Sequence, residues 1–123
     1  MHPELTAYLD ESAWPDVRRE RMVKGLRALQ GIAASGDRPV TYKQFSQHFQ
    51  PGLTSLAAGA VLEDIGQFCN EAGWMNLTCF VVSASTGECS DGFTKISTMD
   101  PKKARDAAWF AYAVYKNGTL VDA

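Results

Sequence analysis

Residues 40–93 set the fold of this chain; they read VTYKQFSQHFQPGLTSLAAGAVLEDIGQFCNEAGWMNLTCFVVSASTGECSDGF. Thr41 and Gln44 have the three-residue spacing of a capping box, which predicts that a helix begins at Tyr42. This helix should be short, because Pro51–Gly52 interrupts the helical pattern.

A second, longer helix is predicted immediately after this turn. Thr54 or Ser55 supplies its N-cap, and Gly73 ends it after Ala72. Apolar residues recur at helical spacing along it, at Val61, Ile65, Phe68 and Ala72. Residues 41–72 are therefore predicted to form a helix-turn-helix.

The next segment is predicted to be a β-hairpin. Leu77–Ser83 is rich in β-branched and aromatic residues, which favours a strand. Turn residues follow, and Phe93–Ile96 is expected to return as the paired strand. A hairpin over residues 77–96 behind a helix-turn-helix corresponds to a wing.

The flanking segments are predicted to be helices. Upstream, Ser12 is a candidate N-cap and Gly36 a stop for a long helix. Its apolar stripe consists of Met22, Leu26, Leu29 and Ala33. Downstream, Asp100–Pro101 is a helix start, and a core helix is expected over residues 101–116. The prediction is one α+β domain, residues 1–123, mainly helical and winged-helix-like, with a small antiparallel hairpin and a C-terminal core helix.

Composition restricts the function. Cys69, Cys79 and Cys89 lack paired spacing, which favours reduced thiols in a cytoplasmic protein over disulfides or a zinc site. No apolar run reaches the roughly 20 residues of a membrane helix, and residues 1–14 do not resemble a signal peptide. We therefore expect no cofactor, metal or membrane partner. The net charge of −2 is opposite to the basic balance typical of nucleic-acid-binding domains.

Residues 40–93 resemble the C-terminal DNA-binding domain of alkylguanine-DNA alkyltransferases and the alkyltransferase-like proteins. VTYKQFSQHF is similar to the family's opening TYGE(I/L)A helix, and SLAAGAVLEDIG to its small-residue recognition helix. LTCFVVSASTGECSDGF is similar to its PCHRVV strand and the G…GG(F/Y) hairpin that follows. The resemblance covers residues 40–93 and implies a winged-helix scaffold that binds double-stranded DNA.

Two departures from the family pattern bear on activity. Gly59 occupies the position of the arginine that replaces an extruded base in the family. Cys79 lies at the position of the acceptor cysteine, but Phe80 and Val81 replace the histidine and arginine that should follow. A thiol needs a neighbouring base or cation to become a nucleophile. The resemblance therefore implies the scaffold more than alkyl transfer, and no catalytic residue is assigned.

The leading hypothesis is a non-enzymatic protein that binds DNA or acts beside a DNA-processing machine. The start of the second helix offers backbone N–H groups to a phosphate, and polar side chains nearby can add contacts. The candidate DNA-binding residues are Lys43, Gln44, Gln47, Thr54, Ser55 and Lys95.

A rival hypothesis keeps the scaffold but makes it an adaptor or inhibitor for a basic protein, as in an accessory protein of a mobile genetic element. It rests on the acidic second half of the longer helix, at Glu63, Asp64, Gln67 and Glu71. Alkyl transfer to Cys79 is the third and least favoured reading. Both a monomer and a homodimer stay open, because the last helix is apolar nearly all round.

Overall fold

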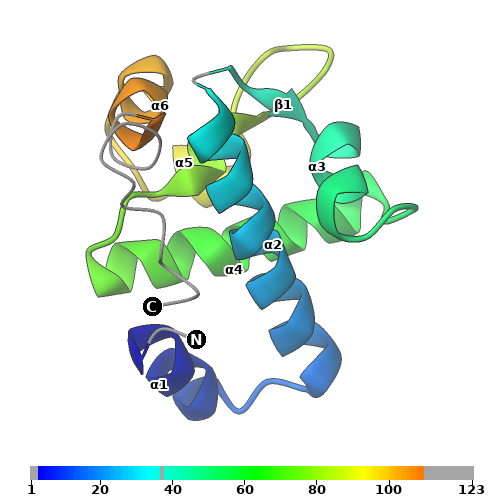
Figure 1. Cartoon of the computed structure of the whole chain (residues 1–123), viewed down its shortest axis with the longest axis vertical. Coiled ribbons are helices and arrows are strands. Elements are labelled where there is room, and N and C mark those ends of the chain that lie inside the picture. Colours follow the sequence, from blue (N-terminus) through cyan, green and yellow to red (C-terminus); the bar gives the residue numbers. More distant parts are fainter. Residues whose placement is uncertain (1–2, 37, 110–123) are drawn as a thin grey trace.

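The computed structural model describes residues 3–36 and 38–109, a mainly helical domain built around two crossing helices. Helix α2 (Asp16–Ser35) passes across helix α4 (Ser55–Ala72) near the middle of both (Figure 1). Gly25 lies at this crossing, where an added Cβ would come within 2.9 Å of Val61 Cγ1 and 3.0 Å of Ile65 Cδ1. A glycine here lets α2 approach α4 closely.

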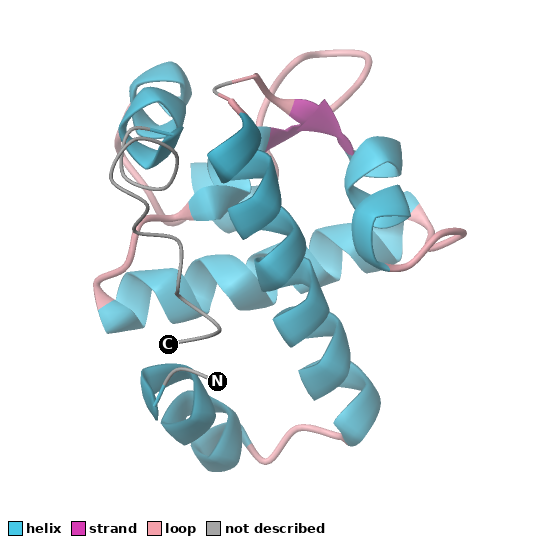
Figure 2. Cartoon of the chain, viewed as in Figure 1, coloured by secondary structure: helices cyan, strands magenta, loops and turns pink. Residues whose placement is uncertain are grey.

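The remaining elements surround this crossing (Figure 2). In chain order they are α1 (Pro3–Ser12), β1 (Val40–Thr41), α3 (Tyr42–Phe49), the 3₁₀ helix η1 (Leu77–Phe80), β2 (Val81–Val82), α5 (Asp91–Thr94) and α6 (Pro101–Trp109). Ser12 was expected to cap α2, but it ends α1: its Oγ donates to the Leu9 carbonyl at 2.7 Å. Helix α2 begins at Asp16, after Pro15.

Helices α3 and α4 confirm the prediction of two capped helices joined at Pro51–Gly52. Thr41 Oγ1 accepts from Gln44 N at 3.2 Å, and Gln44 Oε1 accepts from Thr41 N at 2.9 Å, which completes the capping box. Gly73 ends α4 in the left-handed conformation, at φ 70°. These boundaries follow from signals within a few residues of each helix end.

The prediction of a strand over Leu77–Ser83 was wrong for its first half. Leu77–Phe80 forms η1, which begins where Asn76 Oδ1 accepts from Thr78 N at 3.2 Å. All four side chains of η1 are buried. A segment that is buried on every side does not alternate between polar and apolar residues, and without that alternation a strand cannot be told from a short buried helix. The β-branched composition alone was therefore a misleading signal.

The predicted wing is also absent from the described residues. The strand in this region, β2, is two residues long and pairs in parallel with β1, with Val40 opposite Val81 and Thr41 opposite Val82. A single antiparallel bridge joins Val82 to Cys89 around a tight loop. The expected return strand, Phe93–Ile96, is instead occupied by α5 and the residues after it.

Helix α5 packs directly on α4 through two glycines. An added Cβ on Gly66 would lie 2.1 Å from the Gly92 carbonyl oxygen, and one on Gly92 would lie 2.3 Å from the Leu62 carbonyl oxygen. The two backbones therefore touch without intervening side chains. This contact holds α5 against α4.

Helix α6 begins at Pro101 as predicted, and the part of the expected helix from residue 110 to 116 lies outside the described residues. Within its described part only Ala104 and Ala108 are buried, and Trp109 is 38% exposed, so this part lies at the edge of the core. The core is instead formed by α2, α4, η1 and the residues that contact them. Its large buried side chains include Phe45, Phe68, Phe80, Leu26, Leu62 and Ile65. None of the helices in residues 3–36 and 38–109 is both long and apolar enough to span a bilayer.

Candidate functional site

Helix α3 carries three of the DNA-binding candidates, and one of them, Gln44, already forms a hydrogen bond within the chain. Gln44 is already used in the capping box, where its Oε1 accepts from the Thr41 backbone. Lys43 and Gln47 are exposed. Because α3 packs against both α2 and α4, the helix that carries these two side chains is held in place.

Of the remaining DNA-binding candidates, Thr54, Ser55 and Lys95, only Ser55 is exposed without a side-chain hydrogen bond or ion pair in the described part of the chain. Thr54 Oγ1 accepts from Ala57 N at 3.2 Å and so acts as the N-cap of α4, while Ser55 is exposed at the first helical position. Lys95 Nζ lies 3.2 Å from Asp91 Oδ2 and follows α5, not a wing. The structure therefore brings Lys43, Gln47 and Ser55 to the α3–α4 pair as exposed polar residues.

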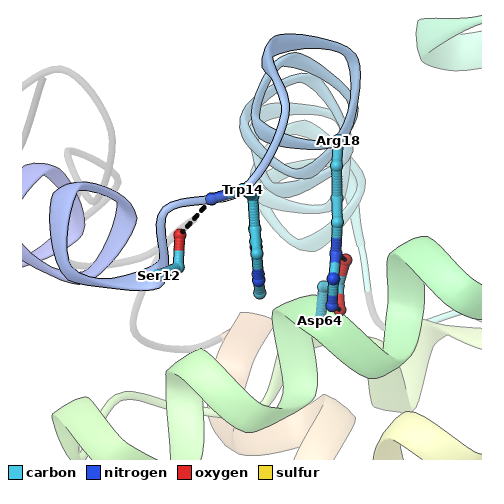
Figure 3. A network of polar contacts seen from close by, with 4 residues as sticks. All are labelled: Ser12, Trp14, Arg18 and Asp64. Carbon is cyan, nitrogen blue, oxygen red and sulfur yellow. Dashed lines mark hydrogen bonds and ion pairs between the residues drawn. The ribbon is translucent and has the colours of Figure 1, made fainter.

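The acidic set on α4 is smaller than its sequence suggests. Asp64 accepts two hydrogen bonds from Arg18, with Nε to Oδ2 at 2.9 Å and Nη2 to Oδ1 at 2.8 Å. The Arg18 guanidinium also lies 3.9 Å from the centre of the Trp14 ring, so it is held between that ring and the carboxylate (Figure 3). Only Glu63, Gln67 and Glu71 stay exposed for a partner.

The exposed half of α4 carries an unusual combination of residues. Leu56 is 87% exposed, Ala60 is exposed, and a Cβ added to Gly59 would meet no atom within 4 Å. Packing in the core explains the small side chain of Ala58, which is buried, but it does not explain Gly59 and Ala60. Helix α4 also contains no lysine or arginine. This part of α4 therefore presents an uncovered apolar and small-residue surface without positive charge.

A groove of about 440 Å³ runs beside this surface, between the first halves of α2 and α4. Its apolar lining comes from Pro15 and Val17 on one side and Ala57, Ala60 and Val61 on the other. Val17 is itself 59% exposed. Sequence inspection missed this groove because it joins residues about 40 positions apart, which no local pattern relates.

Arg21 and Glu63 also line this groove. Arg21 Nε is buried and has no hydrogen-bond partner among the described residues. Glu63 is exposed, and no ion pair to it occurs within residues 3–36 and 38–109. The basic run of α2 is otherwise partly neutralised, since Arg18 pairs with Asp64 and Arg19 Nη2 lies 3.2 Å from Asp10 Oδ1.

The thiols do not form a nucleophilic centre. Burial raises the pKa of Cys69 and of Cys79 to about 12, so both stay protonated near neutral pH. Burial also raises the pKa of Cys89, although the nearby Arg105 guanidinium acts in the opposite direction. Arg105 Nη1 donates to the Cys79 carbonyl at 3.1 Å, so its main contact is structural. These environments do not favour alkyl transfer to Cys79.

Two other observations bear on chemistry. A hollow of about 310 Å³ lies between the end of α4 and the start of α6, next to Trp74, Met75, Phe93 and Met99, and no titratable side chain lines it. Among the described residues no three or more His, Cys, Asp or Glu side chains lie close enough to hold a metal ion. The groove between α2 and α4, in contrast to this hollow, is lined by charged as well as apolar side chains.

Comparison with known proteins found no matching family model, no matching curated protein and no matching solved structure.

Proposed function

We propose that this chain is a non-enzymatic protein-binding domain, an adaptor, that docks through the groove between α2 and α4. The observation that carries the proposal is Leu56, a large apolar side chain that is 87% exposed on α4, next to the uncovered Gly59 and Ala60. Exposed apolar side chains that gather beside a groove mark protein contacts more often than nucleic-acid contacts.

The charge of α4 supports a protein partner over DNA as its ligand. DNA-binding affinity comes largely from lysine and arginine at phosphates. Helix α4 has neither residue, and its exposed acids Glu63 and Glu71 would repel a phosphate backbone. An adaptor tolerates this charge, because protein interfaces are about as apolar as the rest of a protein surface and carry charges of both signs at the rim.

The test is affinity capture after chemical crosslinking in cells, with the wild-type chain and two variants compared side by side. Leu56→Asp places a charge on the proposed surface, so we expect captured partners to fall at least about tenfold. Met99→Asp is the matched control, because Met99 is also an exposed apolar residue, at 55%, but lies before α6. Equal capture by all three proteins would contradict the proposal.

DNA binding is the second candidate, and one observation favours it: Lys43 and Gln47 are exposed on α3, the helix that precedes and packs against α4. A helix N-terminus attracts phosphate, and α3 could add a cation and an amide to it. On this hypothesis the chain has an alkyltransferase-like scaffold and uses its start-of-helix contacts in place of an arginine finger.

Titration against duplex DNA at about 50 mM salt and again at about 200 mM salt separates the two candidates, because electrostatic binding is strongest at low salt. The DNA hypothesis expects binding at the lower salt that weakens on Lys43→Glu and is unchanged on Lys102→Glu, a control on exposed α6. Absence of binding at the lower salt would remove this candidate and leave the adaptor proposal unaffected.

A further inference from the structure

The groove between α2 and α4 has features that complement one another, which bears on what it binds. One face of the chain carries a protruding apolar side chain, Leu56, and an apolar hollow beside Ala57 and Ala60. The same face carries a cation, Arg21, and an anion, Glu63, and neither forms an ion pair within the described residues. A surface that contains both halves of each contact is suited to a copy of itself.

We infer that the partner seated on this groove is a second copy of the chain, in a twofold symmetric dimer with the two α4 helices antiparallel. The inference rests on the proposed protein-binding function and specifies its partner. In a twofold interface residue i of one copy contacts residue j of the other, and j contacts i in return. Arg21 of each copy then pairs with Glu63 of the other, through the outer guanidinium nitrogens, once on each side of the axis.

The register along α4 supports this arrangement. Gly59 and Ala60 leave the helix surface open enough for close approach of a second helix. If the axis passes beside Ala60, antiparallel helices place Glu63 of one copy opposite Ala57 of the other, on the flank where Arg21 lines the groove. A carboxylate there meets the guanidinium of Arg21, which forms no ion pair within the described residues.

Leu56 fits the same register. It comes to lie opposite Asp64 of the second copy, and the Asp64 carboxylate is already neutralised by Arg18 within its own chain. The apolar side chain therefore meets the groove wall, which includes Val17, without desolvating an unpaired charge. Small residues at the centre, an apolar anchor beside them and a charged pair at the flank match the usual anatomy of a protein interface.

Sedimentation velocity of the purified chain over a wide concentration range tests the inference. We expect a concentration-dependent dimer that Leu56→Asp converts to monomer and that Met99→Asp leaves unchanged. Thermal unfolding followed by circular dichroism checks that both variants are folded, which is expected because both side chains are exposed. A monomer at every concentration, or a dimer that Leu56→Asp does not weaken, overturns the inference.

Charge reversal tests the predicted pairing separately. Arg21→Glu and Glu63→Arg should each weaken the dimer at least about tenfold, because each places like charges against each other. The double variant restores opposite charges and should recover most of the lost affinity; failure to recover would overturn the Arg21–Glu63 contact. If the chain is monomeric but Leu56→Asp still abolishes crosslinked capture of other proteins, the adaptor function stands and only the second-copy inference fails.

Discussion

Gly66 of α4 and Gly92 of α5 face each other so closely that an added Cβ on Gly66 would lie 2.1 Å from the Gly92 carbonyl oxygen. The neighbours that such a Cβ would meet are backbone atoms, which cannot rotate away as a side chain can. The two glycines thus fix how α5 packs on α4, because a side chain at either position would collide with backbone atoms.

Gly66→Ala should lower the free energy of unfolding by about 3 kcal/mol, because it overpacks two backbones. Gly31→Ala, at an exposed position of α2 outside the α2–α4 groove, is the matched control. Its Cβ would meet nothing within 4 Å, so the usual preference of a helix for alanine should raise stability by about 0.5–1 kcal/mol. Urea unfolding measures both, and equal effects of the two substitutions would contradict the close contact.

Asp64→Asn should lower the free energy of unfolding by about 1 kcal/mol, near the upper end for pairs that are partly exposed. The Arg18 side chain is 50% exposed and Asp64 15% exposed, so solvent screens part of the attraction. Glu71→Gln, on the exposed side of the same helix and outside the groove, should change stability by less than about 0.5 kcal/mol, because Glu71 has no ion-pair partner in the described chain. The difference between the two variants should shrink in about 1 M NaCl.

Thr54→Ala should cost about 1 kcal/mol of stability, since it removes the acceptor for the Ala57 backbone N–H. Ser55→Ala should be nearly neutral, because Ser55 is exposed within the first turn and does not cap the helix. Both changes are measured by thermal unfolding. A larger effect for Ser55→Ala would indicate that the helix begins one residue later in solution.

The buried thiols predict a loss of stability at alkaline pH. The pKa of Cys69 and of Cys79 rises from 9.0 to about 12 on folding, chiefly through burial. Below pH 9 both states keep the thiol proton, and stability is unaffected. Above pH 9 the unfolded chain releases protons that the folded chain retains, so stability falls as pH rises, until the folded thiols titrate near pH 12.

The decrease in the free energy of unfolding with pH approaches about 1.4 kcal/mol per pH unit for each thiol. Urea unfolding should be measured between pH 9 and pH 10. Above pH 10 the unfolded tyrosines also lose protons, and because folding raises the pKa of Tyr8 and Tyr42 from 10.0, they add to the loss of stability there. Cys69→Ala should remove one thiol's share of the slope, while Cys89 contributes equally to both proteins. An unchanged slope in Cys69→Ala would show that Cys69 is not buried in solution.

The candidate site was predictable only in part. Lys43, Gln47 and Ser55 are exposed on the α3–α4 pair. Gln44 and Thr54 are the caps that their spacing had also predicted, and Lys95 is an ion-pair partner of Asp91. A capping side chain and a ligand-binding side chain have the same residue types, so their roles differ only in what lies next to them. Asp64 was misjudged for a related reason, because its partner Arg18 is 46 residues away.

The sequence by itself determined α3, α4 and the turn between them, because caps, Pro51–Gly52 and apolar spacing act within a few residues of the backbone they control. Only the tertiary structure decided residues 77–96. A strand needs a partner, and β2 finds it in β1, 41 positions earlier and in parallel, while contact with α4 through Gly66 and Gly92 gives α5 its place. The α2–α4 groove likewise exists only through packing, since long-range contacts bring together surfaces that no local pattern connects.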